Sequence, residues 1–321
     1  MSEADSALVV DGLYKRYGQV HAVNGLSFSA PRGSVLGLLG SNGAGKTTTV
    51  RIISTLLPFD TGTVTVLGRD VVADAREVRS RIGLTGQYAA LDDYLTGYEN
   101  LEMIGRLYRL TRGDARRRAA ELIELFELTE AGKRLVKTYS GGMRRRLDLA
   151  ASLIIAPELL ILDEPTTGLD PSSRRTVWGL VRDLVDSGTS LLLTTQYLEE
   201  AEELADDIVV IDKGAVAAQG SPESLKEQVG GARLEVHLAP GTEPKVALGT
   251  VERFGSGPAG IVPDSGLITV PVDRQARLLA RVIRALDEEK IDVADVRLRE
   301  PTLDDVFLTL TGSRSPEPQN A

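Results

Sequence analysis

The stretch that decides the fold is Val35-Leu36-Gly37-Leu38-Leu39-Gly40-Ser41-Asn42-Gly43-Ala44-Gly45-Lys46-Thr47-Thr48. Its apolar first part, residues 35–39, is followed by a helix that we expect from residue 45 to residue 57, before Pro58. An apolar strand that leads into a helix is typical of a parallel sheet covered on both faces. Residues 40–47 fit the pattern G-x-x-x-x-G-K-[ST] between that strand and that helix, which is the setting the motif requires.

The chemistry of this loop points to nucleotide phosphates. Its glycines let successive backbone N–H groups converge on phosphate oxygens, and the helix that follows directs its positive end at the same oxygens. Lys46 can neutralise the β- and γ-phosphates, and the hydroxyl of Thr47 can bind Mg²⁺. The binding candidates are Gly40, Ser41, Asn42, Gly43, Ala44, Gly45, Lys46, Thr47 and Thr48.

A second strand ends in two carboxylates, in Leu159-Leu160-Ile161-Leu162-Asp163-Glu164-Pro165. Asp163, beside a phosphate loop, can hold Mg²⁺ directly or through water. Glu164 points the other way along the strand and can face an attacking water as general base or water-orienting group. Taken alone the segment could be a solvated acidic turn, but the phosphate loop favours the catalytic interpretation.

The remaining pattern predicts an α/β domain over residues 1–230 with a mostly helical insert at about 92–153. Further strands are expected at 190–194 and 208–211, the latter joined to 216–218 by a hairpin, and a helix runs from Pro171 to about residue 185. Within the insert we expect Asp114 to cap a helix that continues through Glu127.

A small α+β domain is predicted over residues 231–312. Its expected strands are 234–238, 267–272 and 293–298, and its expected helices are 275–286 and one that Thr302 caps and that ends near residue 310. The polar tail 313–321 is expected to be disordered.

Composition excludes several classes of function. The 321 residues contain no cysteine, which excludes disulfides and thiolate zinc sites, and the two histidines leave little scope for a histidine metal site. A net charge of −9 with 4% aromatic residues argues against nucleic-acid binding. The run Arg144–Arg146 is expected to be a solvated face or to pair with carboxylates. The stripe of Glu199, Glu200, Glu202 and Glu203 is expected to be a solvated helix face. No apolar run approaches the roughly 20 residues of a bilayer span, and the N-terminus does not resemble a signal peptide, so we expect a cytosolic chain.

The order of motifs resembles the ATP-binding cassette family over residues 8 to about 228. Tyr139-Ser140-Gly141-Gly142-Met143 opens a helix shortly before the carboxylate strand. Alone it is an ordinary helix N-terminus, but here it stands in the family's order of phosphate loop, Gln87, Ser-Gly-Gly helix, Asp-Glu strand and Gly168-Leu169-Asp170.

The resemblance implies roles for individual residues. Tyr17 would stack on adenine, and Gln87 would reach Mg²⁺ and water and couple the core to the insert. The residues that would contact the ATP of a partner subunit are Ser140, Gly141, Gly142 and Asp170. Two positions depart from the family pattern: Met143 and Gln196 stand where glutamine and histidine are usual. Gln196 can still donate a hydrogen bond to the γ-phosphate, but it cannot titrate near neutral pH.

A narrower resemblance is to the daunorubicin-resistance type of ATPase subunit, carried by residues 82–89, 194–198 and 300–308. It implies ATP and Mg²⁺ as ligands, a homodimer of cassettes, and drug or antibiotic export through a permease on a separate chain. The protein would then sit on the cytoplasmic side of the cell membrane, with residues 88–98 near the permease. The alternatives are export of a lipid, glycan or peptide, and a soluble cassette ATPase without a transport role. The C-terminal domain shows no readable chemistry; dimer stabilisation or regulation is an open hypothesis.

Overall fold

The computed structural model describes residues 5–86, 91–228, 232–262, 266–273 and 277–311. The chain divides between Pro222 and Glu223 into two compact units, earlier than the boundary expected at Gly230-Gly231. The expectations for Gln87 and for the tail fall outside the described residues.

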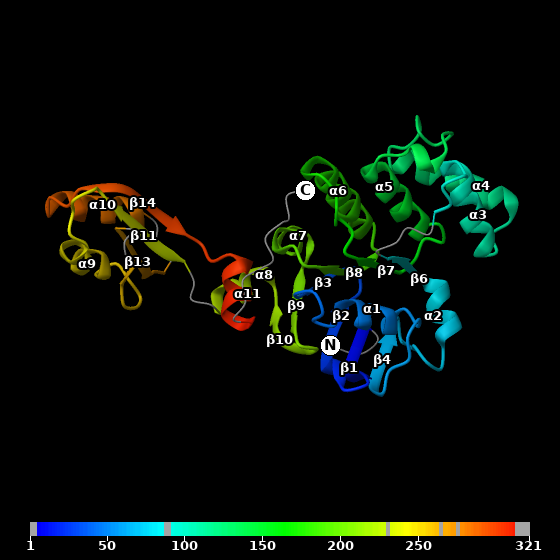
Figure 1. Ribbon diagram of the computed structural model, residues 1–321, viewed down its shortest axis with the longest axis horizontal. Helices are drawn as coiled ribbons and strands as arrows, with labels where there is room; N and C mark the ends of the chain where they lie inside the picture. The colour runs from blue at the N-terminus through cyan, green and yellow to red at the C-terminus, as the bar shows by residue number, and fades with distance from the viewer. Residues whose placement is uncertain (1–4, 87–90, 229–231, 263–265, 274–276, 312–321) are drawn as a thin grey trace. The chain divides into compact units, whose positions relative to one another are not determined.

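A six-stranded sheet forms the centre of the first unit, in the order β10-β9-β3-β8-β7-β6 (Figure 1). All neighbours are parallel except the β9–β10 hairpin. The strands are β3 (Val35–Leu39), β6 (Ile82–Thr85), β7 (Leu159–Asp163), β8 (Ser190–Thr195), β9 (Asp207–Asp212) and β10 (Ala215–Gly220). Because the carboxyl ends of β3, β6, β7 and β8 meet at one edge, the loops that follow these strands come together there.

An antiparallel sheet that the sequence analysis did not anticipate lies against this core, in the order β2-β1-β4-β5. Its strands are β1 (Ser6–Tyr17), β2 (Val20–Pro31), β4 (Thr61–Val66) and β5 (Arg69–Asp70). Buried residues of both sheets and of helix α1 (Lys46–Ile53) form one apolar cluster. The helix is shorter than predicted, because the chain turns at Ser54 and Thr55 takes a positive φ of 64°.

The helical insert contains α3 (Gly97–Leu107), α4 (Arg112–Leu125), the 3₁₀ turn η2 (Val136–Thr138) and α5 (Gly141–Ser152). The predicted cap of α4 is wrong: Thr111 is the N-cap, and its hydroxyl accepts the N–H of Asp114 at 3.1 Å. Asp114 instead accepts the Thr111 hydroxyl proton from within the first turn, and its pKa is lowered by that hydrogen bond.

Three helices complete the first unit: α2 (Ala75–Arg81), α6 (Pro171–Asp186) and α7 (Leu198–Leu204). In Figure 1, α1 lies on one face of the parallel sheet and α5 and α6 on the other. No helix in the described part of the chain combines the length and the apolar character that a bilayer crossing requires.

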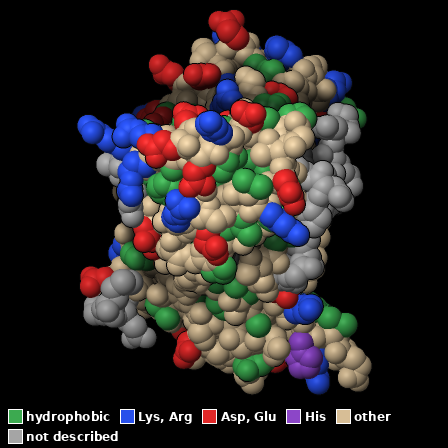
Figure 2. Space-filling view, turned by 90° about the vertical axis from the view of Figure 1, so that its left-hand side faces the viewer, with side chains coloured by type: hydrophobic (Ala, Val, Ile, Leu, Met, Phe, Trp, Pro, Cys, Tyr) green, Lys and Arg blue, Asp and Glu red, His purple; other side chains and the backbone are tan. Residues whose placement is uncertain are grey.

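The second unit is a four-stranded antiparallel sheet in the order β12-β13-β11-β14. Its elements are α8 (Pro222–Gln228), β11 (Arg233–Leu238), α9 (Pro244–Glu252), β12 (Gly260–Val262), β13 (Leu267–Pro271), α10 (Leu278–Glu288), β14 (Val293–Arg299) and α11 (Leu303–Thr311). Apolar residues of β11, β13, α9 and α10 share one core. On the face of the second unit that Figure 2 presents, acidic and basic side chains are interspersed.

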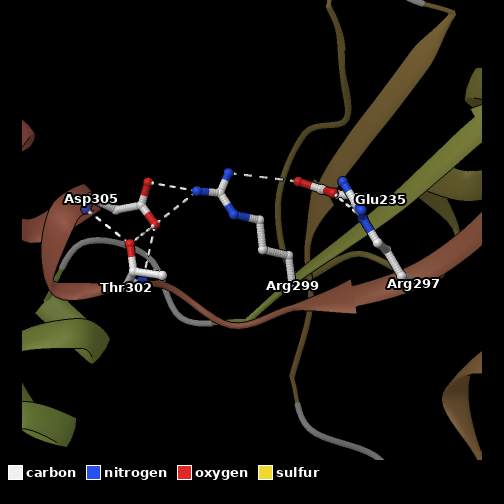
Figure 3. A network of polar contacts seen from close by, with 5 residues as sticks. All are labelled: Glu235, Arg297, Arg299, Thr302 and Asp305. Atoms are coloured by element: carbon white, nitrogen blue, oxygen red, sulfur yellow. Dashed lines mark hydrogen bonds and ion pairs between the residues drawn. The ribbon is translucent and has the colours of Figure 1, made fainter. Parts of the chain in front are cut away.

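A polar network joins this sheet to α11 (Figure 3). The buried carboxylate of Glu235 pairs with Arg297 at 2.7 Å and with Arg299 at 3.6 Å. Arg299 also bonds Asp305, whose N–H donates to the Thr302 hydroxyl at 3.3 Å. Thr302 therefore caps the last helix, as predicted, and the network fixes where that helix begins.

Candidate active site

The phosphate loop takes a conformation that only glycine permits at its end. Gly45 has φ of 111°, and a Cβ there would collide with the carbonyl oxygen of Ala22. The N-terminus of α1 thus stays open toward a cavity of about 200 Å³, which Asn42, Gly43, Thr47 and Thr48 line together with Lys46 and Glu164. Unpaired N–H groups at a helix N-terminus favour an anion, so this cavity suits phosphate oxygens.

Lys46 brings a positive charge into the cavity. Its ammonium donates to the carbonyl oxygens of Gly40 at 2.8 Å and Ser41 at 3.3 Å, and it lies 3.6 Å from Glu164 Oε1. Burial lowers the pKa of Lys46, while the carboxylates of Glu164 and Asp163 act in the opposite direction. The structure therefore brings together the lysine of the first motif and both carboxylates of the second.

The two carboxylates are organised by a residue that the sequence analysis did not single out. Parallel pairing of β7 with β8 sets Asp163 beside Thr194, whose hydroxyl donates to Asp163 Oδ1 at 2.5 Å. The same hydroxyl accepts the N–H of Glu164 at 3.1 Å, and the Thr194 carbonyl accepts it at 3.0 Å. The sequence Thr194-Thr195-Gln196 shows that a hydroxyl residue stands here. Only the pairing of β7 with β8 shows that this hydroxyl bonds Asp163.

Glu164 has a positive φ of 50°, which is uncommon outside glycine and is held here by those two bonds to Thr194. The turn it makes carries its carboxylate off the line of β7 and to 3.6 Å from Lys46, and the Thr167 hydroxyl donates to Oε2 at 3.4 Å. A carboxylate in this position can accept a proton from a water molecule near the phosphate cavity.

The oxygen donors at this edge fit Mg²⁺. Thr47 lines the cavity, and Asp163 is a buried carboxylate whose charge acts on Lys46 in that cavity. Mg²⁺ takes hard oxygen ligands, commonly one or two from protein and the rest from water and substrate phosphates. The described residues contain no group of three or more His, Asp or Glu side chains that could hold a metal ion.

Two more candidates belong to different sheets, Tyr17 to the antiparallel sheet and Gln196 to the segment that follows β8 of the parallel sheet. Tyr17 ends β1 and is 48% exposed, and the Lys15 ammonium lies over its ring, 5.5 Å from the centroid. Gln196 follows β8 and is half-buried.

The Ser-Gly-Gly residues lie elsewhere. Ser140 is the N-cap of α5 and accepts the N–H of Met143 at 3.3 Å. A Cβ on Gly142 would stand 2.7 Å from Ser173 Oγ, so glycine allows α5 to approach the start of α6. Asp170 caps α6 by accepting the N–H groups of Ser172 and Ser173 at 3.0 Å each, and hydrogen bonding to Ser173 lowers its pKa. The helices that these residues begin, α5 and α6, lie on the face of the parallel sheet opposite α1 (Figure 1).

The arginine run forms the ion pairs that the sequence analysis allowed, whereas one residue of the glutamate stripe departs from expectation. Arg144, Arg145 and Arg146 each pair with a carboxylate, of Asp93, Asp148 and Glu127 respectively, but the side chain of Arg145 is only 12% exposed. Glu200, expected on a solvated face, is fully buried.

The buried Glu200 accepts a hydrogen bond from Trp178 Nε1 at 3.1 Å, and burial raises the pKa of its carboxyl. The expectation of a solvated face is therefore wrong for this position. It failed because α7 turns one of its faces against α6.

Comparison with known proteins identifies the family of this chain. The ABC transporter family profile matches residues 23–167. A daunorubicin resistance ATP-binding protein from Streptomyces coeruleorubidus is 53% identical over 96% of this chain and 96% of that protein. A doxorubicin resistance ATP-binding protein from Mycobacterium tuberculosis is 47% identical over 97% of this chain and 95% of that protein. A solved ATP-binding subunit of an ABC transporter is 27% identical, with a TM-score of 0.63 over 70% of this chain and 93% of that one. The chain therefore belongs to the ABC transporter family, whose order of motifs it resembles.

Proposed function

We propose that this protein is the ATP-hydrolysing subunit of a multi-chain exporter that drives a drug or antibiotic out of the cell through a separate permease. One observation carries the ATPase assignment: Lys46, Asp163 and Glu164 converge at one sheet edge beside a glycine-lined phosphate cavity. The drug assignment rests on the relatives, which are named for daunorubicin and doxorubicin resistance and match the chain nearly end to end.

In the proposed reaction the γ-phosphate of ATP lies against the loop N–H groups and the Lys46 ammonium. The Glu164 carboxylate receives the proton of the attacking water, and Gln196 donates a hydrogen bond to the phosphate oxygens. Mg²⁺ held by Thr47 and Asp163 would offset the negative charge of the phosphates. Tyr17 would offer its exposed ring to the adenine.

We also propose that two copies complete each other's sites. The helix α5, which Ser140, Gly141 and Gly142 begin, lies on the opposite face of the parallel sheet from α1, which follows the phosphate loop (Figure 1), and this supports a second chain as the source of the Ser-Gly-Gly contact to the nucleotide. The N-terminus of α5 is suited to a γ-phosphate because the first N–H groups of a helix have no carbonyl partner within the helix and its positive end favours an anion. Asp170 lies at the neighbouring N-terminus of α6 and would approach the same interface.

The permease is proposed to contact the start of the helical insert. Within the described part of residues 88–98, Tyr94 is 76% exposed, and the Lys137 ammonium lies 5.2 Å from the centroid of its ring. An exposed aromatic ring beside a cation suits a short helix docking in a groove. The protein would thereby be held at the cytoplasmic side of the cell membrane. We further propose that the second unit is an accessory domain, with dimer stabilisation or regulation as its role.

The first test is Glu164→Gln, which keeps the size of the side chain and removes its basicity. The variant is expected to bind ATP like the unchanged protein and to hydrolyse it about 10²- to 10⁴-fold more slowly. Asp183→Asn on α6 serves as a control because Asp183 lies outside the cavity. Rapid turnover by Glu164→Gln would remove Glu164 from the role of base.

The second test identifies the transporter. Tagged Glu164→Gln with ATP and Mg²⁺ is used to capture partners from detergent-solubilised native membranes. A multi-span protein in stoichiometric yield supports the exporter, and its substrate distinguishes a drug from a lipid, glycan or peptide. Recovery of ribosomes or DNA-bound proteins without a membrane protein would contradict the transport role and leave the ATPase assignment intact.

A further inference from the structure

Arg145 lies in the first turns of α5 and contacts two loops at the edge of the parallel sheet where the carboxyl ends of β3, β6, β7 and β8 meet. We call this edge the catalytic edge. Its Nε donates to the carbonyl oxygen of Pro165 at 2.5 Å, and its Nη1 donates to the carbonyl oxygen of Gly86 at 3.1 Å. Pro165 directly follows Glu164, and Gly86 directly precedes Gln87. One side chain thus bonds the backbone next to the proposed base and the backbone next to the proposed metal-reaching glutamine.

The guanidinium group of Arg145 is largely buried. Its charge is matched by Asp148 one turn later on the same helix, with Nη1 and Oδ2 3.0 Å apart and both side chains largely buried. Burial lowers the pKa of Arg145, and the carboxylate of Asp148 is the largest influence in the opposite direction. A buried ion pair that only served stability could be replaced by apolar residues at little cost. The two carbonyl contacts are what such a replacement would lose.

The shape of the group makes the contact specific. A guanidinium is a rigid planar fork, so its two bonds set the separation of the two carbonyl oxygens. A lysine ammonium is a compact point on a flexible stem and does not reproduce that fork. Because α5 also begins with Ser140, Gly141 and Gly142, the same helix carries the fork and the Ser-Gly-Gly sequence.

We propose that Arg145 is a positioning residue for ATP hydrolysis, which ties the backbone at Pro165, next to Glu164, and the backbone at Gly86, after β6, to the helix that begins with Ser-Gly-Gly. The proposal rests on the role assigned to Glu164 above. Arg145 touches neither phosphate nor water in this assignment; it acts through the two backbone segments it holds. Displacing a reacting group by about 1 Å can reduce a rate about 100-fold, so loss of the fork should appear in turnover.

The test compares Arg145→Met, Arg145→Lys and the double variant Arg145→Met/Asp148→Leu. The single Met variant leaves Asp148 without its arginine and is expected to lower Tm. The double variant removes both charges and is expected to regain most of that Tm. Arg118→Met is the matched control, because Arg118 also donates to a backbone carbonyl, that of Leu153 at 3.1 Å, but touches neither loop.

The expected result is a fall in kcat of about 10- to 100-fold in the double variant, with the KM for ATP within about twofold of the unchanged protein. Arg145→Lys is expected to retain more kcat than the double variant but less than the unchanged protein. Arg118→Met is expected to keep the kcat of the unchanged protein. A double variant with unchanged Tm and unchanged kcat would overturn the proposal, and so would full recovery by lysine. Glu164→Gln measured in parallel separates the two proposals, because its unimpaired turnover would refute the base assignment whatever Arg145 does.

Discussion

Replacing Thr194 by valine removes a single hydroxyl group from the centre of the catalytic edge. Valine has the same branched shape and suits β8, so the strand should keep its pairing. The N–H of Glu164 keeps the Thr194 carbonyl as acceptor at 3.0 Å, but Asp163 Oδ1 loses the donor that lies 2.5 Å away. Asp163 is therefore the residue that the change releases.

The size of the effect follows from that lost bond. A hydrogen bond to a charged group contributes about 1.5–3 kcal/mol. If the whole of it acts in the transition state, kcat falls roughly 10- to 100-fold, since about 1.4 kcal/mol corresponds to a factor of ten. A carboxylate freed to rotate should also bind Mg²⁺ less well, so we expect a higher Mg²⁺ concentration at half-maximal rate.

The assay is phosphate release by the purified full-length chain at saturating ATP, over a series of Mg²⁺ concentrations. Thr194→Ser keeps the hydroxyl and should stay close to the unchanged protein, and Tm reports whether either variant disturbs the fold. The reasoning is refuted if Thr194→Val folds normally and matches Thr194→Ser in both kcat and Mg²⁺ dependence.

Three further predictions concern separate parts of the chain. Gln196→His should introduce a change in kcat between about pH 5.5 and 7.5 that the unchanged protein lacks, because imidazole titrates there; superimposable pH–rate profiles would argue against contact with the reacting phosphate. Gly142→Ala should lower ATPase activity by pressing on Ser173, and adding Ser173→Ala should restore part of it, which steady-state rates can check. Glu235→Gln should destabilise the second unit by only about 1 kcal/mol, because Arg297, 57% exposed, can return to water; urea denaturation measures the change, and a loss several times larger would contradict this account.

Most of the catalytic edge can be predicted from local sequence patterns. The phosphate loop, the carboxylate pair and the strands that carry them follow from patterns a few residues long. The apolar runs of β3, β7 and β8 predict strands buried on both faces, and all three are fully buried. Such patterns suffice because glycine conformation, strand burial and helix capping depend on adjacent residues.

Expectations failed where a distant element decided the environment. Glu199 and Glu200 are neighbours in an acidic stripe, yet only Glu200 is buried, because it faces Trp178 of α6. Arg145 stands among three arginines of equal appearance, and the loops after β6 and β7 alone make it different from the other two. The N-terminal antiparallel sheet was not predicted because the register of its two long strands, β1 and β2, is interrupted by shifts and the two strands are only partly apolar.

The sequence by itself determined the nucleotide chemistry of this protein: a glycine loop with Lys46, a strand ending in Asp163 and Glu164, and the motif order of its family. The tertiary structure alone decided which other side chains serve that chemistry. Thr194 contacts Asp163, and Arg145 contacts the backbone of Pro165 and Gly86, between segments far apart in the chain, and those contacts arise from strand order and helix packing. Residue type carries the chemical capacity of a group, whereas its partners are set by the burial and pairing of whole elements.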